Sequence, residues 1–232
     1  MDPRAGKQAM SSKDRILARI RRAVPQPGPD TPVAPEARVA PVAPEIPRDY
    51  LRVHGARTPR ERVDLLAANL AEYRALVHRT DEEGLPLLLA RLLAERGSRT
   101  VLVPPGLPPY WLSAADQTPV HDRETSTPRE LDRVDSVVTG CALAVAETGT
   151  VVLDGSPDQG RRRITLIPDH HVCVIRVPDQ VVDSVPQALE RLDPARTLTW
   201  ISGPSATSDI ELDRVEGVHG PRTLEIVLVG AQ

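Results

Sequence analysis

The segment that decides the fold runs from Leu76 to Val103 and reads LVHRTDEEGLPLLLARLLAERGSRTVLV. Leu76-Val77-His78 has the composition of a short strand, and Thr100–Val103 that of another. Between them, Leu85–Glu95 carries leucines at helical spacing and is followed by Gly97. A strand, a helix and a second strand form a right-handed crossover between parallel strands. The segment therefore predicts an α/β fold with a mostly parallel sheet and helices on both of its faces.

Upstream of this segment the sequence predicts an appendage and one further helix. Thr58-Pro59-Arg60-Glu61 is a capping box with proline at the first helical position. Residues 1–24 include a basic amphipathic helix, either a solvated face or a docking arm for a partner. Residues 25–47 contain eight prolines and predict a semi-extended tether. Residues 48–232 are then the globular domain.

Downstream, short apolar runs follow one another with little helix between them, which predicts a β-hairpin-rich part beside the parallel layer. Short helices are expected at Pro108–Ala114, Pro128–Val134 and Ser184–Leu192. The strand-like runs are Val137–Val138, Ala142–Ala146, Thr150–Leu153, Ile164–Ile167, Val172–Val177, Leu198–Ile201 and Leu224–Val229.

Composition narrows the class of protein. The 232 residues are 40% hydrophobic but contain no Phe, so the core consists of Val, Leu, Ile and Ala, as in a sheet buried on both faces. A net charge of −3 and 2% aromatic residues argue against nucleic-acid binding. No run approaches the ~20 apolar residues of a membrane span, and no signal peptide is evident. Two cysteines without a CxxC motif fit a reducing cytoplasm.

The first candidate site is Ala146-Glu147-Thr148-Gly149-Thr150, between two strand-like runs. Gly149 suits a tight turn. The hydroxyls of Thr148 and Thr150 would then face a ligand beside Glu147, which is the catalytic candidate. An ordinary hairpin with a solvated glutamate is the alternative.

The second candidate site is the loop Ile201–Pro221, because loops of about twenty residues in a compact domain are usually functional or disordered. Its hydroxyls and backbone N–H groups suit a carboxylate or phosphate. Its acidic residues and histidine suit acid–base chemistry, a metal ion or simple capping of backbone amides. We favour ligand binding without a metal. The ligand-binding candidates are Gly203, Pro204, Ser205, Thr207, Asp209, Glu211 and His219.

The third candidate site contains two adjacent histidines, His170 and His171. On an extended chain they point to opposite faces, so at most one faces a site. His171 is the ligand-binding candidate, and His170 is expected to be a surface or hydrogen-bonded structural residue. Arg161–Arg163 supply positive charge, for an anionic ligand or as a solvated run.

We further predict that Glu147, Ser205, Asp209 and His219 line one cleft at the strand ends, where ligands bind in open α/β sheets. The alternative is that each motif caps its own local turn.

Taken together, the motif at 146–150, the run Pro168–His171 and the Gly203–Pro221 loop resemble the lactate utilization protein C family, with its LUD domain. The resemblance spans about residues 48–229. It implies a fold similar to the sugar-phosphate isomerase and CoA-transferase superfamily. It also implies a role in oxidising L-lactate to pyruvate with partner proteins that carry iron–sulfur clusters.

Three functions stay open at this point. The first is a cluster-free component of a lactate-oxidising system, which binds a small carboxylate or supports assembly with its iron–sulfur partners. The second is a freestanding CoA-transferase-like enzyme that uses Glu147 as nucleophile or base. The third is a regulatory ligand-binding module without catalysis. Two cysteines alone cannot ligate a cluster, so no cofactor is expected in this chain.

Overall fold

The computed structural model describes residues 13, 16–19, 51–207, 215–216 and 220–230. The chain divides into two compact units, Met1–Asp49 and Tyr50–Gln232. In the first unit, Lys13 and residues 16–19 are helical. The rest of the expected basic helix and the proline-rich tether lie outside the described residues. The second unit carries the sheets and the candidate site.

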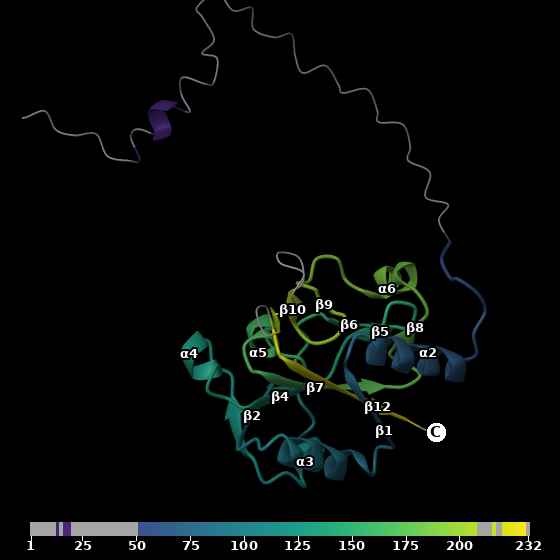
Figure 1. Ribbon diagram of the computed structural model, residues 1–232, viewed down its shortest axis with the longest axis horizontal. Coiled ribbons are helices and arrows are strands. Elements are labelled where there is room, and N and C mark those ends of the chain that lie inside the picture. The colour runs from purple at the N-terminus through teal and green to yellow at the C-terminus, as the bar shows by residue number, and fades with distance from the viewer. Residues whose placement is uncertain (1–12, 14–15, 20–50, 208–214, 217–219, 231–232) are drawn as a thin grey trace, which may run out of the picture. The chain divides into compact units, whose positions relative to one another are not determined.

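Within the described residues, the centre of the second unit is a six-stranded sheet of order β1-β12-β7-β4-β2-β3 (Figure 1). Every neighbouring pair in it is parallel. The mostly parallel α/β fold is thus confirmed, whereas the likeness to the sugar-phosphate isomerase and CoA-transferase superfamily stays a prediction. The strands are β1 (Leu76–Thr80), β2 (Thr100–Val103), β3 (Thr118–His121), β4 (Ser136–Thr139), β7 (His170–Arg176) and β12 (Thr223–Val229).

A second, four-stranded sheet of order β8-β5-β6-β9 is built from the hairpin-rich part of the chain. β5 and β6 form an antiparallel hairpin, β9 pairs antiparallel with β6, and β8 pairs parallel with β5. A two-stranded ribbon of β10 and β11 follows. The bounds are β5 (Leu143–Val145), β6 (Thr150–Leu153), β8 (Val181–Val182), β9 (Thr199–Ile201), β10 (Ala206–Thr207) and β11 (Val215–Glu216).

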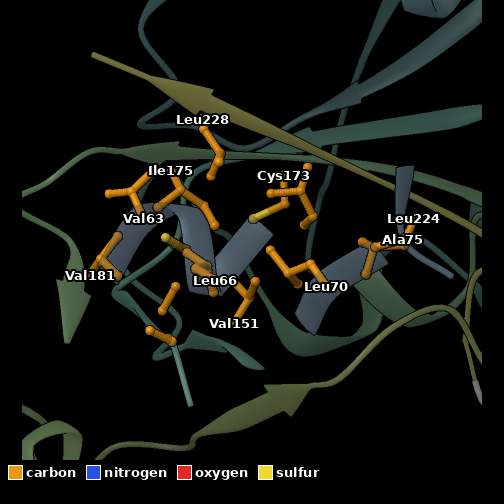
Figure 2. Close-up of a cluster of buried hydrophobic side chains, with 14 of the residues drawn as sticks. Val63, Leu66, Leu70, Ala75, Val151, Cys173, Ile175, Val181, Leu224 and Leu228 are labelled. Atoms are coloured by element: carbon orange, nitrogen blue, oxygen red, sulfur yellow. The ribbon is translucent and has the colours of Figure 1, made fainter. Parts of the chain in front are cut away.

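Helices cover both faces of the main sheet, as Figure 1 shows, with α3 on one face and α2 on the other. α2 lies between the two sheets, and its buried residues Val63, Leu66 and Leu70 pack against both (Figure 2). On the opposite face, α3 packs its leucines on the other side of β7 and β12. The helices are α2 (Pro59–Glu72), α3 (Leu85–Glu95), η1 (Pro109–Leu112), α4 (Pro128–Leu131), α5 (Arg162–Leu166) and α6 (Val185–Arg191).

Local sequence explains where α2 begins. Thr58 accepts a hydrogen bond from the Glu61 backbone N–H at 3.3 Å, and the Glu61 carboxylate accepts one from the Thr58 N–H at 2.8 Å. This is the reciprocal capping box that the sequence predicted. Thr127 and Glu130 form a second capping box at the start of α4.

One expectation about secondary structure was wrong, and one strand of the main sheet was missed. The run Ile164–Ile167 is not a strand, because residues 162–166 form the short helix α5. A four-residue apolar run has too little periodicity to tell helix from strand. Strand β3 was missed because it contains Pro119, and proline in a sheet is tolerated at edge positions such as this one.

Candidate functional site

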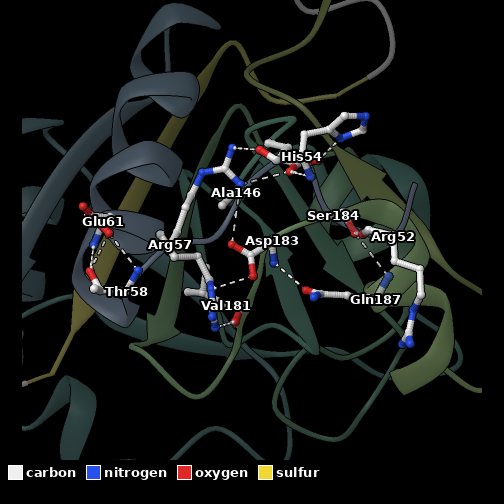
Figure 3. Close-up of polar contacts among 12 residues, drawn as sticks. Arg52, His54, Arg57, Thr58, Glu61, Ala146, Val181, Asp183, Ser184 and Gln187 are labelled. Atoms are coloured by element: carbon white, nitrogen blue, oxygen red, sulfur yellow. Dashed lines mark hydrogen bonds and ion pairs between the residues drawn. The ribbon is translucent and has the colours of Figure 1, made fainter. Parts of the chain in front are cut away.

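Glu147 lies at the turn between β5 and β6. Donors from His54 and Arg57, two residues of the segment before α2 that Figure 3 labels, surround its carboxylate. Its Oε1 accepts hydrogen bonds from the His54 backbone N–H at 2.9 Å and from Arg57 Nη1 at 3.0 Å. Its Oε2 lies 3.0 Å from His54 Nδ1, and the side chain is 15% exposed. Burial by itself would raise the pKa of Glu147, but the bonds from His54 and Arg57 outweigh it and lower the pKa. The carboxylate is therefore ionised and held by donors.

The network continues to Asp183, which is 5% exposed and precedes α6. Arg57 Nη1 lies 3.7 Å from Asp183 Oδ1, and Arg62 Nε lies 3.1 Å from Asp183 Oδ2. Arg57 thus bridges Glu147 and Asp183. Figure 3 shows the Arg57 and Asp183 side chains beside each other. Sequence reasoning missed Arg57 and Asp183, although Arg57 directly precedes the capping box. The arrangement ties the start of α2 to the second sheet.

The two threonines of this motif bond to each other and to the start of the long loop. Thr148 Oγ1 lies 2.8 Å from Thr150 Oγ1, which in turn lies 2.8 Å from Ser202 Oγ. Thr150 is buried, and β9 brings Ser202 beside it. These hydrogen bonds therefore join the 146–150 motif to Ser202, the residue of the long loop that directly precedes Gly203.

Both motif glycines have a packing reason to be glycine. Gly149 has φ +56°, and a Cβ there would lie 2.8 Å from the backbone carbon of Asn69. Gly203 has φ +85°, and a Cβ there would lie 2.4 Å from the carbonyl oxygen of Tyr73. Each glycine can adopt a positive φ and has no Cβ, and the two turns therefore pack directly against the backbone at the end of α2.

Only part of the long loop belongs to the described residues. The Ser205 N–H donates to the Pro221 carbonyl at 2.8 Å, so the two ends of the loop meet. Pro204 is half-buried beside them, and Thr207 is in the short strand β10. The predicted positions Asp209, Glu211 and His219 lie outside the described residues. The shared cleft with Glu147 therefore stays a prediction.

His171 is fully buried and lies 2.8 Å, through Nε2, from Thr139 Oγ1. Burial, reinforced by the neighbouring His170, lowers the pKa of His171 to about 3. Among the described residues, its Nδ1 has no hydrogen-bond partner. His171 is therefore a neutral side chain inside the domain at physiological pH.

His170 belongs to a buried polar chain at the amino ends of the parallel strands. Its Nε2 lies 3.0 Å from Glu225 Oε1, and its Nδ1 lies 2.7 Å from Ser136 Oγ. The second Glu225 oxygen lies 2.6 Å from His78 Nε2. Sequence reasoning missed Glu225, although a single acid inside the apolar run 224–229 was a usable signal.

Two hollows lie away from these motifs. The first, about 440 Å³, lies at the carboxyl ends of β1, β7 and β12 beside the start of α2 and is lined in part by Arg60 and Arg79. The second, about 430 Å³, lies between the loop that follows β6 and the segment that precedes β9. Glu147, His171 and Ser205 line neither of the two.

The part of the chain that the structure describes contains neither a cluster of metal-binding side chains nor a helix that could span a membrane. There, no three His, Cys, Asp or Glu side chains gather closely enough to hold a metal ion. Cys141 and Cys173 are buried free thiols. In the same residues, no helix has both the length and the apolar character needed to cross a membrane.

Comparisons with known proteins place these features in context. The model of the LUD domain family matches residues 63–229. The chain is 46% identical over 165 residues to lactate utilization protein C of Deinococcus radiodurans, covering 69% of this chain and 76% of that protein. It is 32% identical over 191 residues to lactate utilization protein C of Geobacillus thermodenitrificans, covering 72% and 78%. The crystal structure of a DUF162 family protein from Deinococcus radiodurans is similar in fold, with a TM-score of 0.65, 38% identity, and coverage of 75% of this chain and 100% of that one.

Proposed function

The chain belongs to the LUD domain family, and from that premise we propose that it acts in lactate utilization. In this proposal it is a cluster-free component of a system that oxidises L-lactate to pyruvate. It binds a small carboxylate or supports assembly with iron–sulfur partner proteins. The observation that carries the proposal is the 46% identity, over most of both chains, to a lactate utilization protein C.

The cysteine count supports a division of labour between this chain and its partners. An iron–sulfur cluster takes four ligands, usually cysteine thiolates, whereas the sequence contains two cysteines. Both are buried, with Cys141 Sγ 3.8 Å from the Gln180 side chain and Cys173 Sγ 3.6 Å from the Gly140 carbonyl. We therefore assign electron transfer to the partner proteins.

The contacts of Glu147 favour this role over that of a freestanding CoA-transferase-like enzyme. A nucleophilic or basic carboxylate has to reach its substrate. Both oxygens of Glu147 instead face donors from His54 and Arg57. We assign Glu147 the task of fixing the segment before α2 on the second sheet.

Deletion of the gene in its source organism tests the proposal. We expect the deletion strain to grow on pyruvate but not on L-lactate, and growth on L-lactate to return with the intact gene. Equal growth of the deletion and parent strains on L-lactate would refute the role.

Affinity purification without oxygen from lactate-grown cells tests the partners. We expect iron-containing proteins with visible charge-transfer absorption to accompany the tagged chain, while the chain produced alone is colourless. Stoichiometric iron–sulfur absorption in the isolated chain would overturn the division of labour.

A further inference from the structure

The hollow between the segments 154–162 and 196–199 has features of a ligand site, and Glu147, His171 and Ser205 do not line it. Its volume of about 430 Å³ falls within the ~300–1,000 Å³ of small-molecule pockets. Its two walls are the segment that leaves β6 and the segment that enters β9. Three arginines line it, Arg161, Arg162 and Arg196, with Asp154 as the acidic residue of the same lining.

The residues on both sides of Arg162 are fixed to the segment 122–126. Arg161 donates through Nε and Nη2 to the two carboxylate oxygens of Asp122, each at 2.6 Å. Arg163 Nη2 donates to the Ser126 carbonyl at 2.6 Å. These bonds hold the backbone around Arg162 in place. A fixed backbone lowers the entropy lost when a side chain binds a ligand.

Arg162 is the arginine of this lining that has no ion pair with any residue that the structure describes. Among the described residues it has no acidic group within ion-pair distance, whereas Arg161 pairs with Asp122. Arg196 pairs with Asp154 at 2.9 Å and so joins the two walls of the hollow. The lining therefore keeps a net positive charge and offers forked N–H donors, which match carboxylate and phosphate oxygens.

We propose that this hollow binds a small molecule through an oxyanion group, a carboxylate or a phosphate, with Arg162 as its main contact. The Thr197 hydroxyl and the Arg196 guanidinium lie in the same lining and contact the rest of the ligand. The proposal does not depend on the role in lactate utilization.

The other hollow is less suited to an anion. Its arginines, Arg60 and Arg79, share one carboxylate, since Asp64 lies 2.7 Å from Arg79 Nη2 and 4.0 Å from Arg60 Nε. Apolar side chains such as Val63 and Leu228 form much of its wall. Arg60 nevertheless makes a matched control, because it is an exposed arginine in the first turn of a helix, as Arg162 is.

Isothermal titration calorimetry at constant ionic strength tests the site in the full chain. The probes are inorganic phosphate, pyrophosphate, L-lactate and pyruvate. We expect at least one to bind saturably, and we expect R162Q to weaken that binding roughly tenfold or more, the effect of losing one charged hydrogen-bond pair. R162K should fall between the two, and R60Q should leave the affinity unchanged.

The probes separate the two sources of the oxyanion. Binding of the phosphates alone assigns a phosphorylated ligand, and binding of the carboxylates alone assigns an organic acid. Because the exposed Arg162 side chain pairs with no acidic group in the described part of the chain, R162Q should melt at the wild-type temperature, so a loss of binding would not reflect misfolding. No saturable binding of any probe, or equal losses in R162Q and R60Q, would overturn the proposal. Failure here would leave the growth test of lactate utilization unaffected.

Discussion

The buried Glu225 should make the stability of this domain depend on pH in the acid range. Its side chain is 7% exposed and accepts hydrogen bonds from His78 and His170. Burial alone would raise the pKa of Glu225, but these bonds bring it from 4.5 down to about 2. At ~1.4 kcal/mol per pKa unit, the ionised form contributes on the order of 3 kcal/mol to the free energy of unfolding. Because the folded pKa is the lower one, this stabilisation is present above pH 4.5 and is lost as the pH falls toward 2.

Urea unfolding of the wild type and of Glu225→Gln at several pH values measures this contribution. We expect the variant to lose about 3 kcal/mol at pH 7, equivalent to roughly 6–12 °C in melting temperature for a domain of this size. The deficit should shrink as the pH falls below 4.5, because the wild type then loses the same interaction. Glu190→Gln is the control, since its exposed pair with Arg52 should contribute less than about 1 kcal/mol. A Glu225→Gln variant as stable as the control at pH 7 would refute the argument.

Three other changes have defined outcomes. Deleting residues 1–47 should shift the melting temperature by no more than a few degrees, because a tether of this kind lets few contacts cross; an insoluble or molten product would contradict this. Gly203→Ala should cost at least about 2 kcal/mol in chemical unfolding, since its Cβ would lie 2.4 Å from the Tyr73 carbonyl oxygen, whereas Gly97→Ala, with nothing within 4 Å, should cost only the ~1 kcal/mol of its positive φ. Glu147→Gln should lower the unfolding free energy by roughly 1–3 kcal/mol through its two basic partners. Normal growth on L-lactate of a strain that carries Glu147→Gln would remove Glu147 from the catalytic candidates.

Local interactions made the helices predictable. The start of α2 follows from the reciprocal hydrogen bonds between Thr58 and Glu61, which are only three residues apart. α3 follows from leucines at helical spacing. The run Ile164–Ile167 was misassigned because four apolar residues carry no period, and its helix depends on tertiary contacts. The pairing of strands could not be predicted either, because Leu198–Ile201 and Leu224–Val229 have similar sequences and yet lie in different sheets.

The candidate site was predictable only in part, for the same reason. The sequence singled out Glu147, but its partner Arg57, and the Asp183 that Arg57 also contacts, come from segments far away along the chain. The glycines at 149 and 203 are predicted ligand-binding turns, and the sequence did not show that they also approach backbone atoms at the end of α2. A single sequence shows which residues are unusual but not which residues they meet.

The position of β12 has a consequence for how this protein is made. Within the described residues, β12 is the one sheet neighbour of β1, and the His78–Glu225 bond across them joins positions 147 apart. A chain growing on the ribosome must therefore hold β1, and the open edge of β7, without a partner until residues 223–229 have emerged. Such long-range pairing slows folding and leaves unpaired strands exposed to other nascent chains. Yield in the cell should accordingly depend on chaperones that shield those strands during synthesis, more than on the stability of the finished domain.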